Sequence, residues 1–374
     1  MSFYDDLGVR RVINAAAAQT VLGGSLMPGP VLAAMEAAAR SYISLPELHD
    51  RVAERIALLT QNEAACVTCG AAHGVMLAAA ACIVRDQLDR VTELPDVSGF
   101  PRTEIITWKS QWNGFLCGVL ETGATLVEIG SDPAELEAAV GHRTAGIMWF
   151  AGSVFTDGAL PLVDVIRIGQ ERGVPVIVDA ADQVPPAANL WKFTCEIGAD
   201  LAIFSGGKGL RGPQASGIIV GRADLIRACR ANGGPYHSIG RPAKVGKEEF
   251  AGLLAAVERA VSLDEKNEWQ RFSDTVDRWQ AELASFPGIH VERVETSHIG
   301  QPIPRLVLHL ESPLDQENVI AQLWERDPRI AVLPYDEDAI ALNPHLLQSG
   351  EAETVRQSIV DVLLSLDPAV TNKW

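Results

Sequence analysis

The sequence predicts an α/β fold in which a large domain with a mainly parallel sheet carries helices on both faces, and a smaller α+β domain follows it. The first observation is that short apolar runs alternate with helix-period segments between residues 64 and 221. This alternation requires crossover connections, which produce parallel strands covered on both sides. The second observation is that the pattern changes near residue 250 to a long helix, then strands typical of antiparallel pairing and amphipathic helices.

The composition is that of an ordinary globular protein, long enough for a large domain and a smaller one. The chain has 374 residues, of which 47% are hydrophobic and 21% charged, and its net charge is −17. A nucleic-acid partner is disfavoured because neutralisation of phosphates dominates such binding. The six cysteines lie scattered in apolar runs, as reduced thiols do in cytosolic proteins. Neither a signal peptide nor a membrane-spanning stretch is found, so we expect a cytoplasmic protein with no membrane partner. Cys66 and Cys69 have the spacing of a redox or half-zinc pair, but no second close pair follows, so we expect no metal site.

Residues 1–30 are rich in glycine, proline and small residues and have no regular period, so they predict an extended arm that covers another surface. Helices are then predicted at 31–43 and 45–60. The predicted domains are the arm at 1–30, a large domain at 31–249 and a small α+β domain at 250–374.

Period and composition place the remaining elements. The large domain is expected to hold strands at 64–70, 103–108, 124–130, 145–150, 174–181, 200–206 and 216–221, and helices at 71–88, 112–123, 133–140 and 162–173. The small domain is expected to hold one long helix at 252–284, strands at 304–311 and 339–345, and helices at 316–326 and 351–366.

A glycine-rich loop presents one lysine between two apolar strands. The stretch FSGGKGLRGPQASG, residues 204–217, places five glycines and one proline around Lys208. Each glycine in an element interior costs about 0.5–1 kcal/mol relative to alanine, so the loop must turn tightly or approach another group closely. A lysine in such a place can be desolvated, and a desolvated lysine is a nucleophile. The alternative is a solvated lysine in a turn.

Two further features fall on strand ends. VPVIVDAAD ends an apolar strand with Asp179, at the edge where open α/β sheets bind ligands. A helix cap or an ion pair would explain this carboxylate equally well. Upstream, Gly70, Ala71 and Ala72 join a strand to a helix, where backbone N–H groups can bind an anion such as phosphate. Close packing of the helix on the sheet is the alternative for these small residues.

Together the three features match the needs of pyridoxal 5′-phosphate. The lysine would form the Schiff base, the aspartate would pair with the pyridinium nitrogen, and the helix terminus would hold the phosphate. This order of motifs resembles the fold-type I family of pyridoxal-phosphate enzymes.

The resemblance extends to one group within that family. SGGKGLRGPQASG is similar to the lysine loop of the selenocysteine synthase group, which includes seryl-tRNA selenium transferase and D-glucosaminate-6-phosphate ammonia-lyase. INAAAAQTVLGGSLMP, LTQNEAACVTCGAAHGVMLAAAACI, VIVDAADQVPP and IGRPAKVGKEEFAGLLAAVE resemble the lyase-like branch. The match covers most of residues 7–260. It implies a fold-type I architecture.

Carried over by position, the resemblance makes Lys208 the Schiff-base lysine and Asp179 the partner of the pyridine nitrogen. Ser205 would join Cys69, Gly70 and Ala71 around the phosphate.

Gln111 matches the position that stacks on the ring, where relatives often carry histidine. We expect Gln111 to keep the packing role of this position, and Trp112 is the second candidate for stacking on the ring. Arg241 and Lys244 match basic positions that face the anionic group of the substrate, often from a neighbouring subunit; solvated side chains on a linker are the alternative.

His73 lies near the start of the helix, where relatives usually carry a small residue. It is a candidate substrate contact or a donor behind the site. A histidine satisfied within the helix is the competing interpretation.

The freed Lys208 amine can deprotonate Cα, and the resulting carbanion can eliminate, racemise or undergo aldol cleavage. The resemblance favours a lyase that eliminates a β-hydroxyl from an amino acid and yields a 2-oxo acid and ammonia, with D-configured substrates among the candidates. A racemase or an aldolase is the alternative.

A tRNA-dependent selenium transferase is disfavoured by the acidic charge and by the motif that begins within the first fourteen residues. A non-catalytic homologue would need neither Lys208 nor Asp179. Because the arm and the segment around Arg241 are expected to reach a neighbouring chain, we expect a homodimer or higher homo-oligomer with shared active sites.

Overall fold

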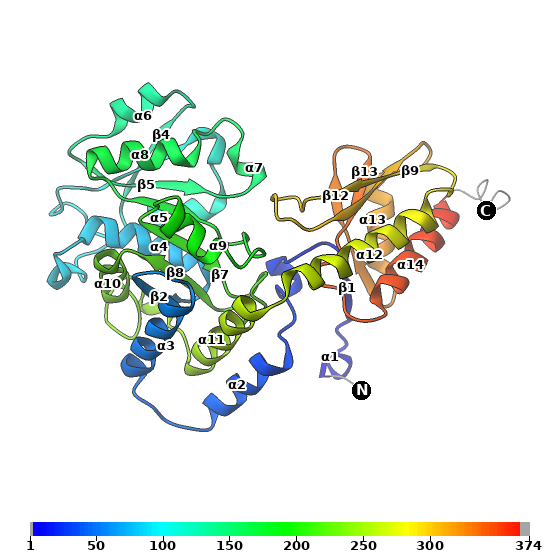
Figure 1. Ribbon diagram of the computed structural model, residues 1–374, viewed down its shortest axis with the longest axis horizontal. Coiled ribbons are helices and arrows are strands. Elements are labelled where there is room, and N and C mark those ends of the chain that lie inside the picture. The colour runs from blue at the N-terminus through cyan, green and yellow to red at the C-terminus, as the bar shows by residue number, and fades with distance from the viewer. Residues whose placement is uncertain (1–2, 367–374) are drawn as a thin grey trace. The chain divides into compact units, whose positions relative to one another are not determined.

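A computed structural model describes residues 3–366 (Figure 1). The chain divides into two compact units. Unit 2 is Ser25–Leu263, and unit 1 combines the residues up to Gly24 with those from Asp264 onward. These limits differ from the predicted boundaries, because the N-terminal arm is divided at Gly24 and its first part belongs with the C-terminal residues. Helix α11 (Lys247–Ser262), most of which was assigned to the small domain, lies in unit 2.

A seven-stranded sheet forms the centre of unit 2. Its spatial order is β2 (Ala64–Thr68), β8 (Gly217–Gly221), β7 (Leu201–Ser205), β6 (Val176–Asp179), β5 (Thr144–Phe150), β3 (Glu104–Trp108) and β4 (Thr125–Ile129). Strand β8 is antiparallel to both of its neighbours, so β2 runs in the same direction as β7. All other pairs are parallel. The predicted mainly parallel sheet is confirmed, with β8 as the reversed strand.

Helices cover both faces of this sheet (Figure 1). The α-helices of unit 2 are α2 (Gly29–Ala39), α3 (Leu45–Leu59), α4 (Gly70–Val84), α5 (Cys117–Leu120), α6 (Pro133–Ala139), α7 (Ser153–Thr156), α8 (Leu162–Arg172), α9 (Asn189–Trp191), α10 (Ala223–Asn232) and α11. Side chains alternate between faces along a strand, so Ile203 packs toward α4 and α10 while Phe204 packs toward α3, α8 and α11. Helix α10 was not predicted from the sequence.

Helix α4 packs closely on the sheet because many of its residues are small. Nearly every side chain from His73 to Val84 is buried, so the helix is apolar on all sides, as a fully enclosed helix must be. A Cβ at Gly74 would lie 2.8 Å from Ile203 Cγ2. This packing fixes the N-terminal turn of α4 at the edge where β2 ends.

Unit 1 contains a four-stranded antiparallel sheet and helices. The strand order is β12 (Leu333–Tyr335), β13 (Ala339–Leu342), β10 (Arg305–Leu310) and β9 (Ile289–Val294), and the main helices are α12 (Glu265–Leu283), α13 (Gln316–Glu325) and α14 (Glu351–Leu366). After the short helix α1 (Phe3–Asp6), strand β1 (Val12–Asn14) pairs in parallel with β11 (Arg329–Ala331). Figure 1 shows the blue β1 among these late elements. The small domain with antiparallel strands is confirmed.

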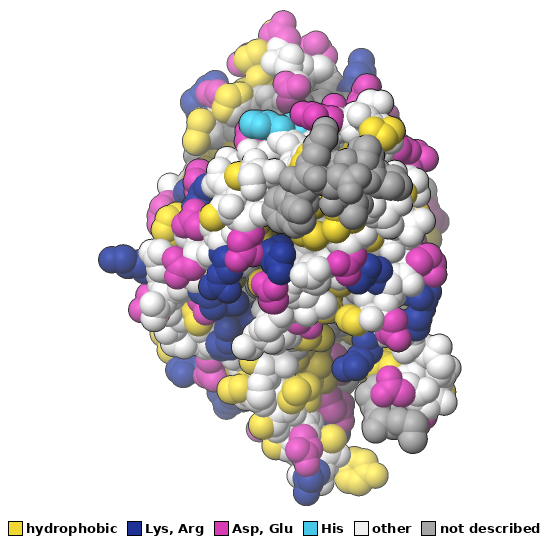
Figure 2. All heavy atoms as spheres, turned by 90° about the vertical axis from the view of Figure 1, so that its right-hand side faces the viewer, with side chains coloured by type: hydrophobic (Ala, Val, Ile, Leu, Met, Phe, Trp, Pro, Cys, Tyr) yellow, Lys and Arg dark blue, Asp and Glu magenta, His cyan; other side chains and the backbone are white. Residues whose placement is uncertain are grey.

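Charges of both signs mix on the surface of unit 1. Figure 2 shows Lys and Arg side chains lying among Asp and Glu side chains on the face turned to the viewer. Three arginines of unit 1, Arg293, Arg326 and Arg356, each pair with carboxylates. Positive charge is therefore locally balanced in this unit. Over residues 3–366, no helix combines the length and the apolar character needed to cross a membrane.

Two predicted helices differ in the structure. The long helix predicted at 252–284 is broken, because Leu263 is extended and the Asp264 side chain accepts a hydrogen bond from the Asn267 amide and starts α12. The helix predicted at 112–123 is reduced to short turns and α5. There Asn113 caps a one-turn segment by accepting from the Phe115 amide. Both predictions were wrong because a polar cap interrupts a continuous apolar period.

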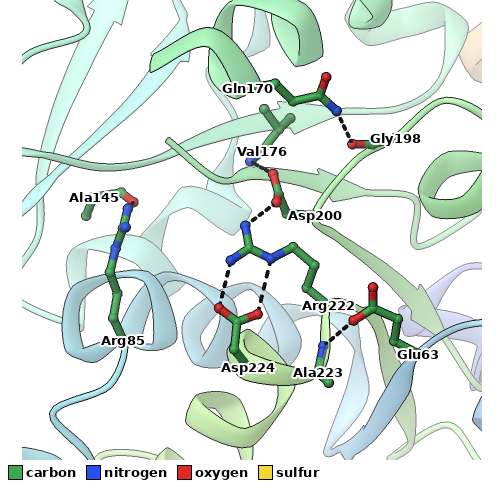
Figure 3. Close-up of polar contacts among 10 residues, drawn as sticks. All are labelled: Glu63, Arg85, Ala145, Gln170, Val176, Gly198, Asp200, Arg222, Ala223 and Asp224. Atoms are coloured by element: carbon green, nitrogen blue, oxygen red, sulfur yellow. Dashed lines mark hydrogen bonds and ion pairs between the residues drawn. The ribbon is translucent and has the colours of Figure 1, made fainter. Parts of the chain in front are cut away.

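A polar network ties the strands together at the edge opposite their carboxyl ends (Figure 3). Asp200, just before β7, accepts a 2.8 Å hydrogen bond from the Val176 amide and a 2.6 Å bond from Arg222, just after β8. Arg222 also holds Asp224 through two bonds, and Glu63 accepts from the Ala223 amide. Asp200 therefore joins the ends of three adjacent strands.

We expect Asp200→Ala to lower the free energy of unfolding by about 2 kcal/mol, because it leaves the buried Val176 amide without its acceptor. Asp224→Ala is the matched control; its half-exposed ion pair contributes about 0–1 kcal/mol. Chemical denaturation of the two variants measures the difference. Equal losses would contradict the assignment of Asp200 as the joining residue.

Candidate active site

Four strand ends meet at the carboxyl edge of the parallel strands. In the sheet register, Gly217 at the start of β8 pairs with Thr68 at the end of β2 on one side and with Ser205 at the end of β7 on the other. Asp179 ends β6, beside β7. The antiparallel direction of β8 thus brings the lysine loop, the start of α4 and the Asp179 carboxylate to one edge, where open α/β sheets bind ligands.

The first turn of α4 lies against Gly217. A Cβ at residue 217 would lie 2.7 Å from the Gly70 carbonyl carbon and 3.0 Å from the Ala71 nitrogen, so only glycine permits this approach. The first N–H groups of an α-helix have no acceptor within the helix. At Gly70, Ala71 and Ala72 they form a site for an anion with the positive end of the helix dipole behind it.

His73 is occupied behind this turn. Its Nδ1 accepts a 3.2 Å hydrogen bond from the Cys69 amide, which fixes the proton on Nε2, and burial lowers the pKa of its imidazole to about 4. The ring is therefore neutral, and Nε2 is buried. The Cys69 amide donates its hydrogen bond to His73 and is therefore not available to a phosphate. The geometry favours the interpretation of His73 as a residue that caps its own helix, and the predicted substrate contact remains a prediction.

Asp179 is a buried carboxylate at the end of β6. It is opposite Ile203 in the register and so lies on the sheet face that α4 covers. Its Oδ1 accepts a 3.0 Å hydrogen bond from the Ala181 amide. Burial raises the pKa of this carboxyl to about 6, against the lowering effects of that bond and of Lys208. A carboxylate in this state favours a cationic or proton-donating partner.

Lys208 faces a second carboxylate that the sequence reasoning missed. Its Nζ lies 3.6 Å from Asp182 Oδ2, and the two side chains are 26% and 15% exposed. Burial raises the pKa of Asp182 to about 6; Lys208 lowers it and the neighbouring Asp179 raises it. The signal was present in VIVDAAD, where a second aspartate follows the first after two alanines.

The glycines of the lysine loop are required by close approach. A Cβ at Gly209 would lie 1.7 Å from the Val184 carbonyl oxygen. The loop closes by a hydrogen bond from the Arg211 amide to the Lys208 carbonyl, and the Ser25 amide donates to the Gly207 carbonyl. Lys208 is thus presented by a loop clamped against the segment that follows Asp182.

Gln111 is fully buried and its amide group is committed. Nε2 donates to the Phe150 and Phe155 carbonyls, and Oε1 accepts from the Phe150 amide. This burial counts against stacking of Gln111 on a ring and makes it a brace at the carboxyl end of β5. Trp112 is 54% exposed, so its aromatic ring has surface available for stacking.

Ser205 and the basic pair Arg241 and Lys244 complete the predicted set. The Ser205 amide donates to the Ala181 carbonyl, so its half-buried hydroxyl is the group left for a ligand. Arg241 and Lys244 line a cavity of about 570 Å³ together with Thr92, Leu94, Pro95, His237, Ser238, Ile239 and Pro242. Neither Lys208 nor Asp179 is among the residues that line that cavity.

Sequence comparison finds relatives over nearly the whole chain. A family model of L-seryl-tRNA selenium transferases matches residues 12–269. The chain is 33% identical, over 95% of its length and 90% of the other's, to a 5′-C-glycyluridine monooxygenase-decarboxylase of a Streptomyces species. It is 28% identical, over 94% of its length and 95% of the other's, to D-glucosaminate-6-phosphate ammonia lyase of Salmonella typhimurium. An L-seryl-tRNA(Sec) selenium transferase of Edwardsiella ictaluri is 30% identical over 67% of this chain and 56% of its own.

Solved structures agree on the fold. A D-glucosaminate-6-phosphate ammonia-lyase matches with a TM-score of 0.84 and 26% identity, over 97% of this chain and 98% of its own. An alanine–glyoxylate aminotransferase from Nostoc matches with a TM-score of 0.61 over 97% of this chain, at 15% identity, and shares the fold alone. The predicted fold class is confirmed.

Because burial raises the carboxyl pKa of Asp179 to about 6, the folded protein without ligand binds this proton more tightly than the unfolded chain does. The charged carboxylate therefore destabilises the folded state, and its cost grows as the pH rises from about 4 to above 6. We expect Asp179→Asn to stabilise the ligand-free protein at pH 8 by on the order of 2 kcal/mol.

The gain should shrink to nothing near pH 4, where the wild-type carboxyl is protonated. Denaturant unfolding of both proteins at several pH values measures this, and Asp224→Asn at the surface is the control. A variant that is less stable than wild type at pH 8 would show that the Asp179 charge is compensated within the fold.

Proposed function

Because this chain belongs to the L-seryl-tRNA selenium transferase family, we propose that it is a pyridoxal-phosphate-dependent lyase that acts on a small amino acid. The observation that carries the proposal is the convergence of Lys208, the buried Asp179 carboxylate and the free first turn of α4 at one edge of the sheet. The cofactor is pyridoxal 5′-phosphate.

The residues fit each part of this cofactor. The amides of Gly70 and Ala71, with the Ser205 hydroxyl beside them across Gly217, suit the phosphate. Asp179 is buried, has one oxygen bonded to a backbone amide and suits the protonated ring nitrogen. Lys208 keeps an accessible amine for the covalent bond. Cys69 contributes to the cradle through its half-buried side chain, since its amide is taken by His73.

The bound cofactor supplies an electron sink for the negative charge that develops at Cα. The Lys208 amine accepts the proton from Cα. The loop that carries Lys208 is clamped in place, which holds the amine in position for this transfer. Asp179 keeps a proton on the ring nitrogen. The buried surroundings of these groups exclude water, which strengthens both electrostatic effects.

The reaction we propose removes a β-hydroxyl group. Loss of the Cα proton and of the hydroxyl releases one water, and hydrolysis of the resulting imine consumes one, so the net products are a 2-oxo acid and ammonia. The similarity to the ammonia-lyase in both sequence and structure supports this outcome.

A second candidate has an observation of its own. The relative described as a monooxygenase-decarboxylase is more similar in sequence than the ammonia lyase, at 33% against 28% identity. An oxygen-dependent decarboxylase of an amino acid is therefore the alternative. It would consume O2 and release CO2, whereas the lyase needs no oxidant. Racemases and aldolases on this scaffold would form neither a 2-oxo acid nor CO2.

We further propose that the active unit is a homodimer or higher oligomer, with Arg241 and Lys244 binding the anionic group of the substrate in the site of a neighbouring chain. Their cavity lacks the Lys208 and Asp179 side chains of their own chain, which supports a role across an interface. Trp112 and Phe115 are exposed large apolar residues that such an interface would cover.

We expect Lys208→Ala to lose covalent cofactor and nearly all turnover, because Lys208 supplies the amine that faces the Asp182 carboxylate at this edge. Borohydride reduction followed by peptide mass spectrometry should find the pyridoxyl group on Lys208 in the wild type. Lys192→Ala, at an exposed site, is the control and should keep both properties. Retention of label and activity in Lys208→Ala would refute the assignment.

The reaction class is tested with D- and L-amino acids that carry a β-hydroxyl group. The lyase should form one 2-oxo acid and one ammonia per substrate consumed, at equal rates with and without O2. Turnover that stops when O2 is removed and that releases CO2 would favour the decarboxylase instead.

Mixed oligomers test the shared site. Lys208→Ala and Arg241→Ala homo-oligomers should each be nearly inactive, and co-expression should restore up to about a quarter of wild-type activity, since one of the two sites in a hybrid dimer is intact and half of the random dimers are hybrids. Differently tagged chains confirm that hybrids form. Hybrids without activity would assign Arg241 to the site of its own chain.

A further inference from the structure

Asp182 is the ionisable side chain that faces the Lys208 amine. The two lie 3.6 Å apart in a largely buried setting. We propose that Asp182 is a positioning residue that holds the Lys208 amine in place through an ion pair. The proposal rests on the proposed function in one respect, namely that Lys208 is the reacting amine.

The two aspartates of this segment differ in their surroundings. Asp179 is held by the Ala181 amide and lies on the strand, on the face toward α4. Asp182 lies beyond the strand, where its carboxylate faces the lysine. After burial, Lys208 has the largest effect on the carboxyl pKa of Asp182. Its effect on the carboxyl pKa of Asp179 is smaller than those of burial and of the Ala181 amide. The two aspartates therefore have different roles: Asp179 interacts with the cofactor ring, and Asp182 interacts with the Lys208 amine.

Charge supports the same division. The groups that act on Asp182 are Lys208, which lowers its pKa, and Asp179, which raises it. Above about pH 6 both carboxylates are charged, so the site is net negative around one amine. An anion within about 4–6 Å favours the charged form of its partner. The ammonium that forms when Lys208 takes a proton from Cα is therefore stabilised by Asp182, which strengthens the base.

The loop geometry makes this contact persistent. Gly209 approaches the Val184 carbonyl so closely that no side chain fits between the lysine loop and the segment after Asp182. Lys208 and Asp182 are thereby kept in register even though the lysine side chain is long. The carboxylate then selects, among the many rotamers of the lysine, those with Nζ at the edge of the sheet.

The test uses the protein free of cofactor and measures how fast Lys208 is acetylated by trace acetic anhydride, with mass spectrometry of the Lys208 peptide. Only the neutral amine reacts. Asp182→Asn should raise the acetylation rate at pH 8 about tenfold, because the amine is released from the ion pair that holds it. Asp182→Glu should stay within about threefold of wild type, since it restores the charge.

Asp179→Asn is the matched control and should change the rate less than Asp182→Asn does. Circular dichroism checks that each variant is folded, and if Asp182→Asn does not fold, Asp182→Ser takes its place. An unchanged rate in a folded Asp182 variant, or a larger effect of Asp179→Asn, would overturn the proposal.

A failure of the proposed function would appear in a different measurement, the borohydride reduction of the wild type. If pyridoxal phosphate is not fixed to Lys208 by borohydride in the wild type, the enzyme assignment fails while the acetylation result still decides the role of Asp182. In the loaded enzyme, loss of Asp182 should lower kcat with little change in KM and shift the pH profile of kcat. Asp182→Glu should restore the profile, which a purely structural role would not predict.

Discussion

The pairing of β8 between β2 and β7 is the constraint on which the site depends. Because β8 runs against both neighbours, its first residue lies at the edge where they end. Gly217 is there in the same row as Thr68 and Ser205, and its missing side chain lets the first turn of α4 approach. A parallel β8 would place its first residue at the opposite edge, beside the Asp200 network. The direction of one strand thus joins the anion site to the lysine loop.

The same edge concentrates negative charge around one lysine. Asp179 is buried and Asp182 is largely buried, both have a raised pKa, and Lys208 acts on both carboxyls. At the opposite edge, by contrast, Asp200, Arg222 and Asp224 satisfy one another (Figure 3). One edge of the sheet therefore holds charges that pair with one another, and the other holds two carboxylates beside a single lysine. Groups with perturbed pKa values gather at functional sites for this reason.

The sequence predicts the parts of this protein whose signals are local. Lys208 and Asp179 are predicted as site residues because glycine-rich loops and strand ends carry short patterns. Asp182 was missed because an aspartate just after a strand looks like an ordinary cap. The burial of His73 and Gln111 could not be predicted, since it depends on bonds to the Cys69 amide and to Phe150 that only the folded chain forms. The pairing of β1 with β11 was also hidden, because it joins residues over three hundred positions apart.

Strand β2 lies at the end of the sheet order and has β8 as its one neighbour in the sheet. Residues 64–68 can therefore join the sheet only after residues 217–221 have been synthesised and have paired with them. During synthesis the chain emerges at about 5–20 residues per second, so the segment that begins the anion site spends on the order of ten seconds without its strand partner. Contacts of such long sequence separation form late, because the intervening loop must close first. A nascent chain would therefore acquire the cofactor only after the lysine loop and β8 have left the ribosome.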